Sequence, residues 1–167
     1  GIDRFCRVDD GASTMDYDAD EIKRKISISA SVAPVEWKDC KINLIDTPGY
    51  ADFVGEVIGA LSVADMAVIL ADAVGGVEVG TELTWGYADQ RNLPRMVVVS
   101  RMDRENADFK KVVTALKDAF GNNVVPIQLP IGTADKFTGV VDLIKMKAYT
   151  WKDATGKNFT ECPIPSE

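Results

Sequence analysis

The sequence lacks several features that mark membrane, secreted or nucleic-acid-binding proteins. No apolar run in its 167 residues approaches the roughly 20 residues of a membrane-spanning helix. Cys6, Cys40 and Cys162 are odd in number and form no Cys-x-x-Cys pair, which favours free thiols in a reducing cytoplasm over disulfides or a zinc site. The net charge of −7 argues against broad nucleic-acid binding. We therefore expect a soluble cytoplasmic domain.

Histidine and the phosphate-binding loop Gly-x-x-x-x-Gly-Lys-[Ser/Thr] are also absent. That loop cradles the β- and γ-phosphates of a nucleotide through charge-assisted hydrogen bonds, each worth about 1.5–3 kcal/mol. Losing three or four of them weakens binding by at least about 10³-fold. We therefore expect this chain alone to bind nucleotides poorly.

A first motif, Asp46-Thr47-Pro48-Gly49, directly follows the apolar run 42–45. An aspartate that ends a strand can hold Mg²⁺ through the ion's water shell. Glycine adopts conformations closed to other residues, so the N–H of Gly49 can point at a phosphate oxygen and swing away when that oxygen leaves. The same residues also make an ordinary β-turn after any strand. The motif therefore needs support from a second site.

The second motif, residues 100–103, reads Ser-Arg-Met-Asp and follows the β-branched run 96–99. Such a short apolar run is typical of a buried parallel strand. Ligand sites of parallel sheets lie at the carboxyl ends of the strands, where both Asp46 and Asp103 fall. The alternative is a strand followed by a solvated helix start. Both motifs in this order favour a nucleotide site.

Nearly the whole chain resembles the GTPase domain of translation elongation factor G. The resemblance extends beyond the two motifs to other stretches in matching order, among them 35–38, 76–78, 93–95 and 138–143. Tyr50 and the segments 31–37 and 79–82 are more similar to the divergent elongation factor G-like branch. The resemblance implies an α/β fold: a P-loop GTPase-like parallel sheet with crossover helices, lacking the first strand and the phosphate loop, plus part of the inserted subdomain.

The resemblance implies roles for four residues around the metal and the γ-phosphate. Ser27 and Asp46 would serve Mg²⁺, and Gly49 would sense the γ-phosphate. Tyr50 stands where the housekeeping factor has a histidine that helps to position the attacking water; a phenol can orient water but cannot share a histidine's charge state at neutral pH. From the residues alone, Ser27 could instead be a strand-edge serine, and Tyr50 could simply pack beside Phe53.

Asp103 matches the guanine-reading aspartate of the family's Asn-Lys-x-Asp motif, while Ser100 replaces the asparagine and Arg101 replaces the lysine. Each lost supporting hydrogen bond costs about 1 kcal/mol. The resemblance thus implies guanine recognition with altered supports. Altered base preference is an alternative.

The polar segment 13–25 lacks a regular apolar period, and we expect a mobile loop at this place, which corresponds to switch I. Lys25 replaces the family's glycine there, so a side chain occupies a position where the family has backbone freedom. Buried strands are expected at 66–70 and 96–99. The apolar stripes at 53–61 and 109–120 predict core-facing helices, the second capped by Gly121.

Residues 1–123 are expected to form a partial GTPase core with switch I and switch II. Residues 124–167 would hold the last visible strand of that core and the start of the inserted subdomain, with a turn at 154–156. The stretch 131–133 is not the family's guanine-contacting Ser-Ala segment, which lies beyond the insertion. Truncation at both ends is the simplest interpretation.

The functional expectation is a fragment of a ribosome-associated translational GTPase that binds and hydrolyses GTP with Mg²⁺ in the intact protein. This chain alone is expected to be inactive. Its partners would be a guanine nucleotide and, through other domains, the ribosome, with no membrane and no sequence-specific nucleic acid. The alternative is a GTPase-like scaffold or binding module without turnover.

Overall fold

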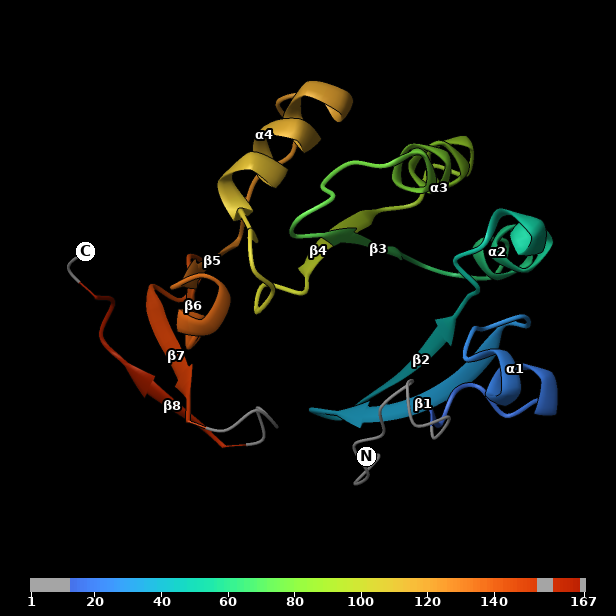
Figure 1. Cartoon of the computed structure of the whole chain (residues 1–167), viewed down its shortest axis with the longest axis horizontal. Coiled ribbons are helices and arrows are strands. Elements are labelled where there is room, and N and C mark those ends of the chain that lie inside the picture. The colour runs from blue at the N-terminus through green and yellow to red at the C-terminus, as the bar shows by residue number, and fades with distance from the viewer. Residues whose placement is uncertain (1–12, 153–157, 166–167) are drawn as a thin grey trace. The chain divides into compact units, whose positions relative to one another are not determined.

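The computed structural model describes residues 13–152 and 158–165. The chain divides into two compact units, one of residues 1–67 and 83–96, the other of residues 68–82 and 97–167. In chain order the elements are α1 (Ala19–Arg24), β1 (Ser31–Trp37), β2 (Cys40–Asp46), the 3₁₀ turn η2 (Ala51–Phe53), α2 (Val54–Leu61), β3 (Ala67–Asp72), α3 (Val79–Gln90), β4 (Arg95–Ser100), α4 (Phe109–Phe120), β5 (Gln128–Ile131), η3 (Ala134–Lys136), β6 (Gly139–Asp142), β7 (Lys147–Trp151) and β8 (Phe159–Cys162) (Figure 1).

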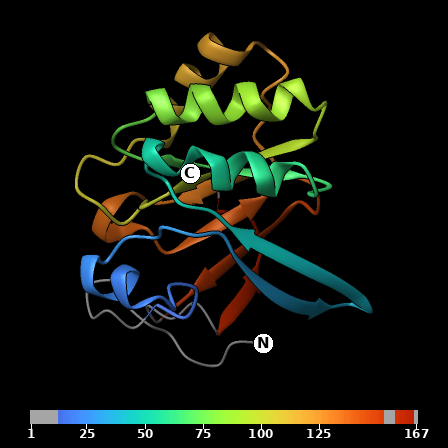
Figure 2. The same ribbon diagram turned by 90° about the vertical axis from the view of Figure 1, so that its right-hand side faces the viewer.

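Strands β1 and β2 form an antiparallel hairpin, seen as two long adjacent strands in Figure 2. The pair Trp37 and Cys40 closes it around a two-residue turn. Both turn residues, Lys38 and Asp39, have positive φ angles of 46° and 63°, as the tight turn that matches strand twist requires. The hairpin places Asp46 at the end of β2, as the sequence predicted.

Strands β3 and β4 are hydrogen-bonded neighbours joined through helix α3. The N–H of Ala67 donates to the Pro94 carbonyl at the starts of the strands (2.9 Å), and the N–H of Ala73 donates to the Ser100 carbonyl at their ends (3.0 Å). Starts paired with starts mean that the strands run parallel, with α3 as the crossover. The predicted α/β class with a parallel sheet is confirmed.

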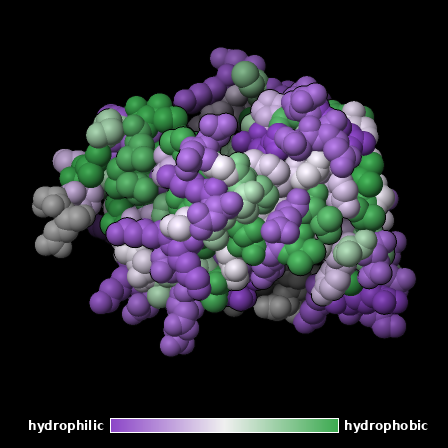
Figure 3. Space-filling view, turned by 90° about the horizontal axis from the view of Figure 1, so that it is seen from above, coloured by the Kyte–Doolittle hydropathy of each residue, from purple (hydrophilic) through white to green (hydrophobic). Residues whose placement is uncertain are grey.

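The expected full burial of this sheet is wrong for the described residues. Along β3, buried Ala67, Ile69 and Ala71 alternate with Val68 and Leu70, which are 50% and 66% exposed. One face of the strand is thus covered and the other is not. Figure 3 likewise shows hydrophobic residues at the surface among hydrophilic ones.

Helix α2 begins where the sequence predicted, but its apolar stripe is not core. None of its residues, all of them within the described part of the chain, is buried, and Ile58 is 36% exposed. The spacing correctly indicated a helix. Periodicity reports which side chains share a face, not whether another element covers that face.

Helix α4 has the core-facing stripe that its sequence predicted. Val112 and Leu116 are buried against Ala71 of β3, with Phe120 packed alongside. The Asp108 side chain accepts from the Lys111 N–H at its start, and Gly121, with φ of 92°, ends it. These contacts form the main core of the second unit.

The remaining strands form an antiparallel sheet in the order β5-β6-β7-β8. Strand β5, expected as the last strand of the GTPase core, pairs with β6. Edge-to-face ring pairs Phe137–Trp151 and Tyr149–Phe159, with centroids 5.4 and 5.7 Å apart, pack on this sheet. The turn predicted at 154–156 falls outside the described residues.

The expected mobile loop at 13–25 is instead partly helical. Asp18 and Glu21 form a capping box in which the Asp18 carboxylate accepts from the Asp20 N–H and the Glu21 side chain accepts from the Asp18 N–H. Periodicity missed α1 because six residues are too few to show an apolar stripe; the Asp18-x-x-Glu21 spacing was the available signal.

Lys25 ends α1 in the left-handed conformation, with φ of 57° and ψ of 38°. Its N–H donates to the Glu21 carbonyl at 2.7 Å, the bond that closes such a helix end. A side chain in this conformation costs about 1 kcal/mol relative to glycine, the residue that the family has here. Lys25 therefore holds the left-handed conformation at this helix end and carries its strain.

Lys25→Gly is therefore expected to raise the free energy of unfolding by about 0.5–1 kcal/mol, because the strain of the left-handed conformation outweighs the entropy that glycine gains in the unfolded chain. Urea denaturation of the wild type and the variant measures this difference. The matched control is Lys23→Gly inside α1, which is expected to destabilise. Equal losses at both positions would contradict the strain argument.

Candidate functional site

Asp46 ends β2 with its side chain exposed. Partial burial by neighbouring atoms raises the pKa of its carboxyl, the nearby negative charge of Asp16 raises that pKa further, and a hydrogen bond from the Thr47 N–H opposes both. The electrostatic potential at the Asp46 carboxyl is therefore made more negative by Asp16. A cation bound there would relieve the repulsion between the two carboxylates.

Ser27 lies in the loop between α1 and β1 and not in a strand, so the strand-edge alternative is wrong. Its Oγ donates a hydrogen bond to Oδ1 of Asp16 at 2.7 Å, and Asp16 is 8% exposed. Because the hydroxyl hydrogen points at Asp16, the lone pairs of Oγ are left to coordinate a cation. Sequence reasoning missed the place of Asp16 beside Ser27.

The side chains of Ser27, Asp16 and Asp46 offer only oxygen donors, which suit Mg²⁺. No group of three or more His, Cys, Asp or Glu side chains within residues 13–152 and 158–165 is arranged to hold a metal unaided. Mg²⁺ is commonly bound by one or two carboxylates together with waters and substrate phosphates. The oxygen set and its excess negative charge therefore fit a Mg²⁺ ion that a phosphate also holds.

The turn after Asp46 runs through buried Pro48 to exposed Gly49 and Tyr50. Gly49 is outside the set of positive-φ glycines, and a Cβ built on it meets no atom within 4 Å. In this conformation Gly49 does not adopt the positive φ angle that only glycine takes readily, which was the reason the sequence suggested for a glycine here. Tyr50 is 57% exposed, and its backbone carbonyl accepts from the Phe53 N–H at 3.0 Å. A role for either residue at a γ-phosphate stays a prediction.

Ser100 ends β4, Arg101 directly follows it, and both contact the neighbouring strand β3. Ser100 Oγ donates to the Ala71 carbonyl at 3.3 Å, and an Arg101 guanidinium nitrogen lies 2.9 Å from Oδ2 of Asp72. Arg101 has a positive φ of 59°. Both replacements in the second motif therefore brace the strand ends.

Asp72 organises this corner of the second unit, and sequence reasoning missed it. Its Oδ1 accepts from the N–H groups of Val74 and Gly75 at 2.8 and 3.1 Å. These two bonds, followed by the contact with Arg101, lower the pKa of Asp72 to about 2. The carboxylate therefore stays charged at neutral pH and can hold Arg101 in place.

Asp103 is exposed in a tight turn that the Arg104 N–H closes onto the Arg101 carbonyl at 3.1 Å. The next residue back, Met102, is 6% exposed and packs in a buried cluster. The Ala134 N–H from η3 donates to the Met102 carbonyl at 3.0 Å. The buried Met102 thus fixes the turn, while Asp103 is exposed to solvent.

The predicted residues fall into two groups. Ser27 and Asp46 belong to the first unit and are linked through Asp16; Ser100, Arg101 and Asp103 belong to the second. Each group is ordered by contacts within its own unit. Within the described residues β2 pairs only with β1 and β4 only with β3, so the expectation that Asp46 and Asp103 share the edge of one hydrogen-bonded sheet is wrong.

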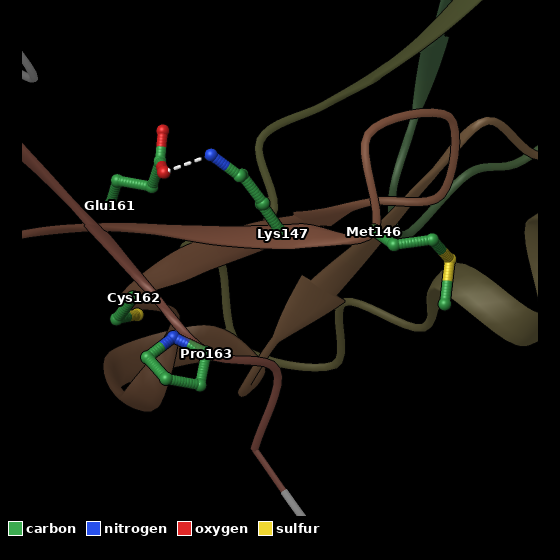
Figure 4. A pocket seen from close by; sticks show the side chains of 5 residues that line it. All are labelled: Met146, Lys147, Glu161, Cys162 and Pro163. Atoms are coloured by element: carbon green, nitrogen blue, oxygen red, sulfur yellow. Dashed lines mark hydrogen bonds and ion pairs between the residues drawn. The ribbon is translucent and has the colours of Figure 1, made fainter.

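A shallow pocket of about 300 Å³ lies on the antiparallel sheet (Figure 4). Its lining comprises Met146, Lys147, Glu161, Cys162 and Pro163, with an ion pair between the lysine and the glutamate. None of the predicted site residues lines it.

Within the described residues, Cys40 and Cys162 carry free thiols. No helix in this part of the chain is long and apolar enough to cross a membrane.

Comparison with known proteins gives two findings. The sequence family described as "Elongation factor Tu GTP binding domain" matches residues 2–159. A crystal structure of a protein from Thermus thermophilus matches with a TM-score of 0.89 and 36% sequence identity, covering 98% of this chain. The chain spans only 24% of that protein's length.

Proposed function

We propose, because this chain belongs to the elongation factor Tu GTP-binding domain family, that it carries the nucleotide-sensing segments of a translational GTPase. The finer proposal is an elongation factor G-like protein that works with the ribosome in the cytoplasm. GTP and Mg²⁺ would be its ligands, and hydrolysis would switch the conformation of the intact protein.

The observation that carries this proposal is the hydrogen bond from Ser27 to Asp16 beside Asp46. It leaves the lone pairs of the Ser27 Oγ free of Asp16, and the negative charge of Asp16 also acts on the Asp46 carboxyl, whose pKa it raises. When bound, Mg²⁺ would neutralise phosphate charge during transfer. Ser27 would coordinate it directly and Asp46 would hold it through its water shell.

Each of the other residues has a limited part. The Gly49 N–H would donate to a γ-phosphate oxygen, and the Tyr50 hydroxyl would orient the attacking water. Asp103 would accept hydrogen bonds from the ring N–H and amino group of guanine. Asp72 would hold Arg101 at the edge of that base site, a support that the observed ion pair favours.

The test is equilibrium titration of the full-length protein that contains this chain with GTP, GDP and ATP in the presence of Mg²⁺. We expect guanine-selective binding that is weakened when Mg²⁺ is chelated. The same titration on the isolated chain is expected to give binding at least about 10³-fold weaker, because the phosphate-binding loop is not in this sequence. Equal affinity for ATP and GTP in the full-length protein would refute guanine recognition.

A scaffold without turnover is the second candidate, and Tyr50 favours it. A phenol lacks the second ring nitrogen with which a histidine accepts and returns a proton near neutral pH. Tight guanine binding by the full-length protein without GTP hydrolysis, with and without ribosomes, would support the scaffold over the enzyme.

A further inference from the structure

The segment after Ser27 is held by two carboxylates through three consecutive backbone N–H groups. Glu21 Oε1 accepts from the first two, at residues 28 and 29, at 2.9 and 3.0 Å. Glu56 Oε2 accepts from the third, at residue 30, at 2.7 Å. We call these three bonds the carboxylate clamp.

Glu21 is the fixed side of the clamp. It is 1% exposed, one of the largest fully buried side chains in the described residues. Its second oxygen accepts from the Asp18 N–H at 3.0 Å, so one carboxylate joins the start of α1 to the segment after Ser27. A buried charge is tolerated when it is satisfied in this way, and leaving it unsatisfied is costly.

Glu56 is the other side, and it comes from a different element. It lies on α2, the helix that follows the turn carrying Gly49 and Tyr50, and it is exposed. Its bond to residue 30 therefore joins the segment of Ser27 to the helix after that turn. No other contact described above connects these two parts.

We infer that Glu21 and Glu56 are positioning residues that set the place of the Ser27 hydroxyl. Glu21 fixes the backbone next to Ser27, and Glu56 makes that placement depend on α2. A change in the turn that displaces α2 would reach Ser27 through this bond. The inference rests on the proposed function, since a metal role for Ser27 gives the placement its use.

The test begins with the clamp itself, by amide hydrogen exchange at residues 28–30 in the nucleotide-free full-length protein. Glu56→Ala is the main variant because the side chain is exposed and its loss leaves no buried charge. Exchange at residue 30 is expected to quicken about tenfold, with partial rescue in Glu56→Gln, whose amide oxygen still accepts. Glu36→Gln, exposed on β1, is the matched charge control.

The second measurement is the Mg²⁺ concentration that half-saturates the Mg²⁺-dependent tightening of GTP binding. In Glu56→Ala we expect it to rise about tenfold, while guanine nucleotide affinity with Mg²⁺ chelated stays unchanged. Glu21→Gln is expected to act in the same direction. A merely stabilising role would leave the Mg²⁺ dependence of the folded protein unaltered.

The outcomes separate the two proposals. Unchanged exchange at residue 30 in Glu56→Ala would overturn the clamp, and faster exchange with unchanged Mg²⁺ dependence would overturn its positioning role. If the wild-type protein binds no guanine nucleotide, the proposed function fails and the metal part of this inference falls with it. The exchange result would still decide whether the clamp exists.

Discussion

Asp103→Asn is expected to lower the affinity of the full-length protein for GTP and GDP by about 10²–10³-fold. An ionised carboxylate that accepts two hydrogen bonds contributes about 1.5–3 kcal/mol for each, and the asparagine keeps one acceptor while placing a donor against a donor. Because Asp103 is exposed and its turn is anchored through Met102, the substitution is expected to leave stability unchanged. Competition titration with a fluorescent nucleotide measures the loss.

The Asp103→Asn variant is expected to gain affinity for xanthosine nucleotides while it loses affinity for guanosine nucleotides. Xanthine carries a carbonyl where guanine carries the amino group, so the asparagine amide can donate where the aspartate accepted. The variant is therefore expected to bind xanthosine triphosphate better than the wild type does. An unchanged preference for guanine would remove Asp103 from base recognition, and a loss of binding for both bases would indicate a damaged fold.

Asp46→Asn is the second large change. It is expected to weaken Mg²⁺-dependent GTP binding by about 10–100-fold, the usual effect of losing a group that orients a metal's surroundings. The raised pKa of Asp46 reflects partial burial first and repulsion by Asp16 second. A neutral asparagine removes this repulsion in the metal-free protein, whereas in the metal-bound protein the cation would already offset it. The metal-free fold is therefore expected to be slightly more stable while Mg²⁺ binds less well.

Titration of Mg²⁺ against a fixed concentration of GTP separates these effects. Asp39→Asn is the control, because it makes the same charge change at the opposite end of the same hairpin, at a position where asparagine accepts the positive φ of 63°. Equal Mg²⁺ dependence in both variants would show that Asp46 acts only through overall charge.

The positions of the two motifs and of helix α4 could be predicted from the sequence. The two motifs fell at the carboxyl ends of β2 and β4, and the stripe of α4 faces a core as predicted. The strand ends and the helical spacing of α4 depend on neighbours within a few residues, whereas the burial of its stripe also needs Ala71 of β3. Patterns of apolar and turn residues report such neighbours directly.

Contacts between residues far apart in the chain could not be predicted from the sequence. The partners Asp16 and Asp72 lie 11 and 29 residues from Ser27 and Arg101, and no spacing rule links such pairs. The exposed faces of α2 and β3 were misjudged for the same reason: whether a face is covered depends on what packs against it. The helix α1 was a different failure, since its capping signal was present and the apolar period was used instead.

The two sides of the carboxylate clamp differ in how fast they can reform. The Glu21 bonds span seven and eight residues, whereas the Glu56 bond spans 26. Closing a loop of about ten residues takes roughly 10–100 ns, and the entropic cost grows with loop length. Most of the longer span is the folded hairpin β1–β2, so the attachment to α2 needs both the hairpin and α2 in place, whereas the attachment to α1 needs only the short segment before residue 30. The Glu56 bond would then set how soon the Ser27 hydroxyl returns to its place.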